Sequence, residues 1–352
     1  MIKIALLSYR QDIVEATPPQ RARALLAEAA LQGVSWVYLD PSKSKPDQKL
    51  VMARYWNGTG WSQEYQELPD VVYITGLPLL PEHIPVDEMI RQNCKIVADK
   101  GMNKLALSQA LETGEAAKYL PYCAKIPTEN PTGMLTEFLR KNGATVVKRT
   151  TGNKGIGLFF ITPQGNDGMF EIRYDNTVFQ APLEEAAAYV AERISGRLRY
   201  RDYLAQRYIN SRSDDNRAVD IRIHIQRGYG GEWAITRSYI CLGGFGLLVA
   251  NTNKGGFQGS LMDFLKQRKL RSADELYAEL IHAAKLVSTA QDAWHPRPLC
   301  ELGLDFVIDE NDQIWMIESN TFPQSANHEL PRATHIIGYA KWLAQQPATP
   351  DK

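Results

Sequence analysis

Short apolar runs alternate with amphipathic stretches through the first hundred residues. Four runs are typical of strands: 2–7, 34–39, 71–75 and 95–98. Two stretches between them have helical spacing: 21–30 and 87–92. After a polar connection at 41–47, two β-rich runs at 51–57 and 61–65 flank a Gly-Thr-Gly turn and predict a hairpin. Alternating strands and helices predict a small open α/β domain with a mostly parallel sheet.

The rest of the chain mixes strands and helices differently. Between 99 and 204 we expect helices at 103–111, 132–142 and 183–194, an extended stretch at 119–127, and β-rich runs at 144–148, 158–162 and 170–179. After 204 we expect strands at 205–209, 220–226 and 233–241, helices at 260–269, 273–291 and 334–345, and a hairpin within 301–320. The chain is therefore predicted to be an α/β (α+β) protein in three parts, 1–98, 99–204 and 205–346, with a disordered tail at 347–352.

The hairpin at 301–320 carries the clearest chemistry. Two β-rich runs, 304–308 and 314–317, flank the polar cluster 309–312. With the turn centred on 311 and 312, positions whose numbers add up to 623 lie opposite each other, so Asp305 faces Glu318. Alternation then divides the side chains between two faces. One face is predicted to carry Asp305, Val307, Met316, Glu318 and Asn320, and the other Phe306, Ile308, Trp315 and Ile317.

Two facing carboxylates repel each other, and each costs several kcal/mol if it is buried without a partner. A divalent cation removes that cost, and carboxylate and amide oxygens suit Mg²⁺ or Mn²⁺. Asp305, Glu318 and Asn320 are therefore candidate metal ligands. The alternative is an exposed hairpin end with solvated acids, which the dense apolar flanks argue against.

Polar side chains also line up along the predicted strand 220–226. Isoleucines at 221, 223 and 225 occupy one face, and the other face carries Asp220, Arg222, His224 and Gln226. Such a strand either faces solvent or lines a polar cleft, and the pattern favours neither. His224 by itself is expected to be a hydrogen-bonded strand histidine rather than a ligand.

A glycine-rich loop at 150–157 joins two predicted strands. Its backbone N–H groups could close over phosphates while Lys148 reaches them from the preceding strand. The alternative is a tight hairpin that uses glycine only for its turn. No Gly-Lys-Ser/Thr follows and no helix begins there, so the loop is not a P-loop. A second polar loop, 250–256, could present Asn251 and Lys254 to an anion.

Composition narrows the class of protein. Of 352 residues, 44% are hydrophobic and 23% charged, and Lys plus Arg equals Asp plus Glu at 40 each. We therefore expect a globular protein that binds neither nucleic acid nor a membrane. No signal peptide or long apolar run is evident, and the four cysteines have no paired spacing. Reduced cysteines and a cytoplasmic location are expected.

Seven short motifs occur in order between about 99 and about 323. They are Asn103 with Lys104, Tyr-Leu-Pro at 119–121, Val-Val-Lys at 146–148 with the glycines of 152–157, Gln-Arg-Tyr-Ile at 206–209, Asp-Ile-Arg at 220–222, Asn-Thr-Asn-Lys-Gly-Gly at 251–256, and 305–320. In this order they resemble the ATP-grasp superfamily of carboxylate–amine ligases. The likeness is strongest to its YheC/YheD-type, spore-coat-associated branch, and 1–98 fits that family's N-terminal domain.

The resemblance implies a role for each matching residue. The α- and β-phosphates of ATP would be held by Lys104 and Lys148. The lid over the triphosphate would contain Gly152, Gly155 and Gly157. The hinge strand that meets the adenine would be Gln206, Arg207, Tyr208 and Ile209. Asp305 and Glu318, thirteen positions apart as in related D-alanine ligases, would hold Mg²⁺ or Mn²⁺ with Asn320. The transferred phosphate or the substrate carboxylate would meet Arg222, Arg237 and Asn251.

The resemblance implies a ligase that makes an acyl phosphate from ATP and a carboxylate and then joins it to an amine. Small-molecule or peptide acids and amines would be the substrates, and a homodimer is the common default. The alternatives are a kinase on the same fold and a non-catalytic, coat-type nucleotide-binding protein. Two departures touch the lid and the substrate end: Arg149 stands where a proline is usual, and Thr-Phe-Pro-Gln follows Asn320 where Pro-Gly is more common.

Overall fold

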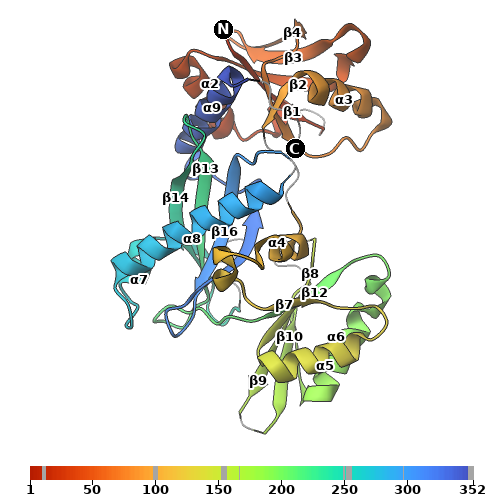
Figure 1. The fold of residues 1–352 in the computed structure, drawn as a ribbon, viewed down its shortest axis with the longest axis vertical. Helices are drawn as coiled ribbons and strands as arrows, with labels where there is room; N and C mark the ends of the chain where they lie inside the picture. Colours follow the sequence, from red (N-terminus) through yellow and green to blue (C-terminus); the bar gives the residue numbers. More distant parts are fainter. Residues whose placement is uncertain are drawn as a thin grey trace.

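The computed structural model describes residues 1–9, 13–97, 102–151, 157–165, 167–248, 250, 256–295 and 297–347. Three β-sheets organise these residues, and Figure 1 shows them one after another along the long axis of the molecule. The first sheet lies at the top, the third in the middle and the second at the bottom. The N-terminus lies at the top of the view.

The first sheet belongs to the predicted α/β domain. Its strands are β1 (Lys3–Ser8), β2 (Ser35–Lys45), β3 (Leu50–Trp56), β4 (Trp61–Glu67), β5 (Val71–Thr75) and β6 (Lys95–Val97), in the order β4-β3-β2-β1-β5-β6. Strands β2, β1, β5 and β6 run parallel, and the β2-β3-β4 end is antiparallel. Its helices are α1 (Ile13–Ala16), α2 (Pro19–Gln32) and α3 (Ile84–Asn93), with short 3₁₀ turns η1 (Pro46–Gln48) and η2 (Pro81–His83). The expected polar connection at 41–47 is wrong, because β2 continues to Lys45.

The second sheet is antiparallel throughout. Its strands are β7 (Cys123–Lys125), β8 (Thr145–Arg149), β9 (Phe159–Gln164), β10 (Met169–Tyr174), β11 (Thr177–Pro182) and β12 (Tyr203–Arg207), in the order β11-β10-β9-β8-β12-β7. Its helices are α5 (Pro131–Asn142) and α6 (Leu183–Leu198), which pack with the sheet around one apolar core. The β-rich run at 170–179 is a hairpin of β10 and β11, and Asp175 in its turn has a left-handed φ of 49°.

The third sheet is also antiparallel. Its strands are β13 (Val219–Arg227), β14 (Trp233–Leu242), β15 (Phe257–Gly259), β16 (Glu301–Ile308) and β17 (Ile314–Asn320), in the order β15-β14-β13-β16-β17. Around it lie α4 (Lys104–Leu111), η3 (Glu115–Tyr119), α7 (Leu261–Leu265) and α8 (Ala273–Trp294). The predicted isoleucine face of β13 lies in this core. Helix α7 is shorter than the 260–269 expected, because Arg268 beyond it turns to bond Asp312.

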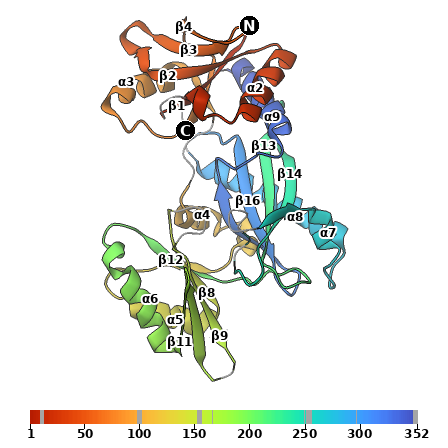
Figure 2. The same cartoon turned by 180° about the vertical axis from the view of Figure 1, so that it is seen from behind.

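The last helix, α9 (Glu329–Gln345), returns to the first sheet. It packs beside α2, and both views show the two helices together at the top of the molecule (Figures 1 and 2). Ile336, Ile337 and Tyr339 are at most 3% exposed in the same core as Ile4 and Tyr38. The predicted boundaries at 98/99 and 204/205 stay predictions, but the last helix shares the core of the first sheet.

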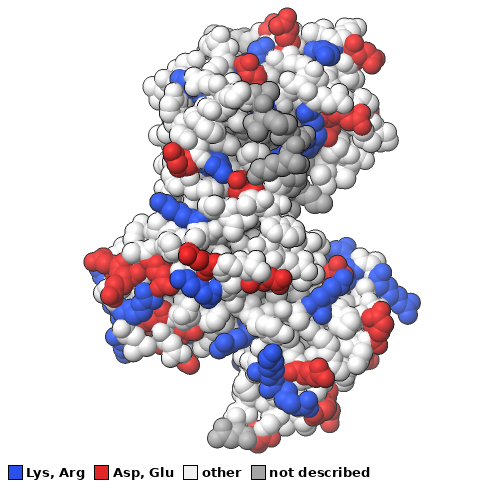
Figure 3. Space-filling model, in the orientation of Figure 1, with Lys and Arg blue, Asp and Glu red and all other residues white. Residues whose placement is uncertain are grey.

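Charged side chains of both signs are interspersed over the surface in Figure 3, which shows no large area of one sign. This agrees with a net charge of zero. Among the described residues, no helix is long and apolar enough to cross a bilayer.

Candidate active site

A cavity of about 440 Å³ lies between the second and third sheets. One wall comes from β8, β9 and β12, and the other from β13, β14, β16 and β17. Residues from these strands are far apart in sequence, and the two antiparallel sheets bring them face to face. Most of the residues that the sequence singled out lie on this cavity.

The β16–β17 hairpin places its two acids as predicted. Asp305 lies opposite Glu318, and Gly303 lies opposite Asn320. Between Asp305 and Phe306 the register shifts by one residue, so Ile317 is an extra residue in β17. A bulge of this kind changes which side chains share a face.

The bulge corrects the predicted faces of β17. Met316 was expected beside the acids, but it lies opposite Phe306 and is 2% exposed in the core. Ile317 was expected on the core side, but it lines the cavity with Val307 and Glu318. Trp315 lies opposite Val307, and its indole N–H donates to Asp309 at 2.9 Å. The strict alternation used in the sequence prediction fails because it assumes an uninterrupted ladder.

Each acid of the hairpin is paired with a cation. Arg222 on β13 donates to both oxygens of Asp305, at 2.5 and 2.9 Å. Lys104, at the start of α4, donates to Glu318 at 3.0 Å. Helix α4 begins there because Asn103 caps the backbone N–H groups of 105 and 106. Burial raises the pKa of Asp305, and Arg222 only partly offsets it. Two carboxylate–cation pairs therefore lie side by side at this cavity.

Lys148 reaches the cavity from β8 with its side chain almost wholly buried, since the residue is 6% exposed. Burial, with Lys104 nearby, lowers the pKa of Lys148 to about 8. A buried ammonium of this kind is stabilised most when an anion occupies the cavity.

The four predicted hinge residues, 206–209, all line the cavity. Gln206 and Arg207 end β12, whose partners are β7 and β8, and the other two residues follow it. The backbone N–H groups of Arg207 and Tyr208 are already bonded to Tyr122 and Ala144 at 2.9 and 2.8 Å. Gln206 and Ile209 complete the run, and Ile209 is 7% exposed.

Other predicted residues lie away from the cavity or outside the described part of the chain. Arg237 on β14 is absent from the described residues that line the cavity, and its guanidinium donates to the carbonyl of Asn327 at 2.7 Å. Gly157 has a left-handed φ of 73°, which favours glycine, and its neighbour Leu158 lines the cavity. Outside the described residues lie Gly152, Gly155 and Asn251.

Asp220 is a cavity residue that the sequence pattern did not single out. It lies on β13 two positions before Arg222 and lines the cavity, which decides for a polar cleft over a solvent-facing strand. Burial, with Asp305 nearby, raises the pKa of Asp220 to about 7. The available signal was the alternation of 220–226, which already placed Asp220 and Arg222 on one face.

The hairpin residues suit a hard divalent cation. Asp305, Glu318 and Asn320 all line the cavity and offer carboxylate and amide oxygens. Asn320 contacts Asp305 at 3.4 Å, so the two side chains converge. No group of three or more His, Cys, Asp or Glu side chains within the described ranges is arranged to hold a metal. Two carboxylates with one amide are nevertheless a normal set for Mg²⁺ beside nucleotide phosphates.

Comparison with known proteins identifies the family. A family model described as YheC/D-like ATP-grasp matches residues 93–343. The chain belongs to this family. It is 23% identical over 312 residues to the endospore coat-associated protein YheD of Bacillus subtilis, covering 82% of this chain and 66% of YheD. The chain therefore spans just under two thirds of that relative's length.

Solved structures agree on the ATP-grasp fold. D-alanyl-alanine synthetase A from Vibrio cholerae superposes with a TM-score of 0.57 at 14% identity, over 98% of this chain and 96% of that one. N5-carboxyaminoimidazole synthase from Aspergillus clavatus, in complex with ADP and 5-aminoimidazole ribonucleotide, gives 0.55 at 11% identity, over 97% and 77%. At these identities the likeness shows the ATP-grasp fold.

Proposed function

We propose that this ATP-grasp protein is an ATP- and Mg²⁺-dependent ligase that joins a substrate carboxylate to an amine. The observation that carries the proposal is the facing pair of Asp305 and Glu318 on one cavity wall, with Lys104 and Lys148 beside it. Clustered acids and lysines at a cavity suit a metal and a polyphosphate together. The two solved relatives support this proposal, since one is a synthetase and the other contains ADP.

The proposed reaction has two steps. A carboxylate oxygen of the substrate attacks the γ-phosphorus of ATP, the bond to the β–γ bridging oxygen breaks, and ADP leaves. The amine nitrogen then attacks the acyl carbon, the bond from that carbon to the phosphate oxygen breaks, and inorganic phosphate leaves. The surplus proton of the amine passes to solvent. Phosphoryl transfer of this kind depends on neutralising charge between donor and acceptor.

The chain's own residues divide that work in the proposal. Lys104 and Lys148 hold the α- and β-phosphates, and 206–209 hold the adenine. Arg222, which now neutralises Asp305, contacts the transferred phosphate or the substrate carboxylate. Mg²⁺, held by the hairpin acids and Asn320, would neutralise phosphate charge. The substrates are proposed to be small-molecule or peptide acids and amines.

A screen for ADP release tests the proposal. The protein is incubated with Mg·ATP and pairs of amino acids or peptides, and any active pair is analysed by mass spectrometry. A new amide bond supports the ligase, whereas a phosphorylated hydroxyl would identify a kinase on the same fold. Nucleotide binding without turnover of any pair would favour a non-catalytic coat-type protein.

Glu318→Ala should abolish ADP release while leaving the fold intact. The Lys104–Glu318 pair is partly exposed, with side chains 16% and 28% accessible, so its loss should cost only about 0–1 kcal/mol of stability. ADP release and thermal unfolding are measured together. Glu310→Ala, an exposed acid in the same hairpin turn, is the matched control and should keep full activity. Near-normal ADP release by Glu318→Ala would contradict the metal assignment.

A further inference from the structure

Segment 321–327, between β17 and α9, forms part of the cavity wall. Its first residues, Phe322, Pro323 and Gln324, line the cavity. Pro323 packs closely over Gly303, because a methyl group added there would lie 2.6 Å from the Pro323 Cβ. This segment also carries the sequence that departs from the family's usual Pro-Gly.

Side chains behind this segment hold it in three places. Ser325, 1% exposed, donates to Glu329 and accepts from Arg21, both at 3.0 Å. Asn327 donates to Gln258 at 2.9 Å, and its carbonyl accepts from Arg237. His328, immediately after the segment, contacts the ring of His224 at 2.5 Å. The cavity face of the segment is thus fixed from its opposite side.

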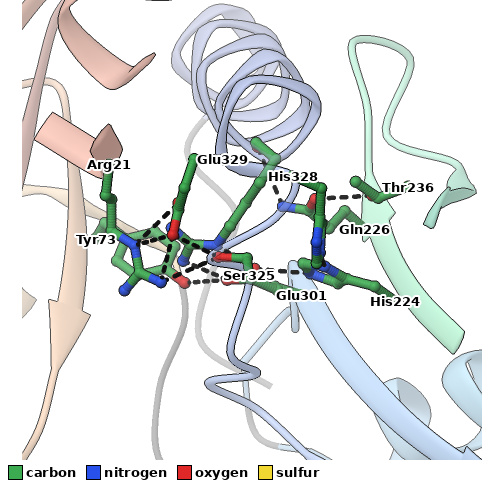
Figure 4. A network of polar contacts seen from close by, with 10 residues as sticks. Arg21, Tyr73, His224, Gln226, Thr236, Glu301, Ser325, His328 and Glu329 are labelled. Atoms are coloured by element: carbon green, nitrogen blue, oxygen red, sulfur yellow. Dashed lines mark hydrogen bonds and ion pairs between the residues drawn. The ribbon is translucent and has the colours of Figure 1, made fainter. Parts of the chain in front are cut away.

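The third contact leads into a buried polar chain, drawn in Figure 4. His224 Nε2 lies 2.8 Å from Glu301, which also accepts two bonds from Arg332 at 2.5 and 2.8 Å. The Tyr73 hydroxyl on β5 donates to the same carboxylate at 2.7 Å. Glu301 and His224 are each 1% exposed. The chain therefore ties the third sheet to the first sheet and to α9.

The partners assign the protons along this chain. Burial alone would raise the pKa of Glu301, but Arg332 and His224 outweigh it and hold that pKa well below its usual range. An ionised Glu301 requires a proton on His224 Nε2. The other nitrogen of His224, Nδ1, lies 2.5 Å from His328 Nε2, so a hydrogen bond joins the two rings. His328 Nδ1 has no partner among the described residues, so His224 is its anchor.

We propose that His328 and His224 are positioning residues for the substrate end of the site, holding segment 321–327 against the cavity through Glu301. The kinetic consequences of this proposal rest on the proposed ligase function. Strand β13 presents Arg222 to the cavity and His224 to the anchor, so one strand sets both the phosphate region and the wall. Displacement of this wall should weaken the binding of the acid or amine substrate rather than that of the nucleotide.

Hydrogen exchange tests the anchor without any substrate. In His328→Ala, amides of segment 321–327 should exchange about ten- to hundredfold faster, the effect of losing one buried hydrogen bond. Thr236→Val is the matched control, because the Thr236 hydroxyl donates to Gln226 at the far side of the network. It should leave segment 321–327 unchanged. The affinity for Mg·ADP, measured by calorimetry, should stay within about threefold in both variants.

Kinetics separate a positioning role from a structural one. With a pair of standard amino acids found active by ADP release, His328→Ala should raise KM for that pair about tenfold and leave KM for ATP unchanged. His328→Gln, which keeps an N–H donor towards His224, should restore most of the loss. If no pair is turned over by the wild-type chain, the ligase proposal fails while the exchange comparison still decides the anchor.

Two outcomes overturn the inference: unchanged exchange of segment 321–327 in His328→Ala, or a loss of Mg·ADP affinity as large as the loss of substrate affinity. Should His328→Ala not fold, Ser325→Ala replaces it. That change removes the contacts of Ser325 with Arg21 and Glu329 but keeps the Arg21–Glu329 ion pair at 3.0 Å. It should loosen the same segment.

Discussion

Lys148 shows how one buried charge can report on the cavity. Its burial opposes the charged form, and the nearby Lys104 adds to that effect, so its pKa falls to about 8. A bound polyphosphate favours the charged form instead. Occupation of the cavity and protonation of this lysine are therefore linked.

The affinity for Mg·ADP should fall as the pH rises above 8. Below about pH 8 the ammonium of Lys148 is already present, whereas above it each pH unit costs up to tenfold in affinity, because binding must take up a proton. Calorimetry between pH 7 and 9.5 measures this. Lys148→Arg stays charged and should give a flat profile over the same range. A flat wild-type profile would contradict the phosphate role.

His328 should make stability depend on pH. Burial, with His224 and Arg237 nearby, lowers its pKa to about 4, below the value near 6.5 expected in the unfolded chain. The unfolded state then binds more protons between these values, so stability is complete above about pH 6.5 and falls towards pH 4. The slope should reach at most about 1.4 kcal/mol per pH unit.

Urea unfolding at pH 7, 6, 5 and 4.5 measures that slope. His328→Gln cannot titrate, so its stability should fall less steeply than that of the wild type over the same interval. Other groups, such as His335, contribute to both proteins alike. Parallel curves for the two proteins would show that His328 is not buried in its neutral form.

At the scale of the element, strand β17 shows what one extra residue does. The bulge at Ile317 keeps Glu318 opposite Asp305 while turning Met316 into the core. Pairing across a short hairpin follows from local geometry. The face of each side chain depends on whether the ladder is interrupted, which the turn alone does not determine.

Met316→Ala and Ile317→Ala should therefore differ in their effects on stability and on nucleotide binding. Met316 is 2% exposed in the core, so its truncation should cost about 2–5 kcal/mol. Ile317 is only half-buried and lines the cavity, so its truncation should cost less and should weaken nucleotide binding instead. Denaturant unfolding and Mg·ADP titration of both variants measure these effects. The reverse order of stabilities would instead support the uninterrupted strand predicted from the sequence.

At the scale of the whole molecule, the two ends of the chain share one core. Helix α9 packs on α2 and on the face of the first sheet that contains Tyr38. The Lys95 side chain also donates to the carbonyls of 343 and 344 near the end of α9, at 2.8 and 3.1 Å. The first part of the chain therefore completes its core with residues from the last.

Ile337→Ala should destabilise the first sheet, although Ile337 lies far from that sheet in sequence. The side chain is fully buried in that core, so the expected cost is about 2–5 kcal/mol. Hydrogen exchange should show reduced protection of backbone amides in β1 and β5 as well as in α9. The exposed neighbour Leu330→Ala, at 54% exposure, is the control and should have little effect. Loss confined to α9 would mean that the helix is an independent unit.

The sequence by itself determined what depends on near neighbours. Periodicity located most strands and helices, and the short turn set Asp305 opposite Glu318. Only the tertiary structure decided the pairing of Arg222 with Asp305, the return of α9 to the first sheet, and the anchor of His328 on His224. Those contacts join residues 83 and 104 positions apart or distant elements. No local pattern encodes them, because they arise from how whole sheets pack.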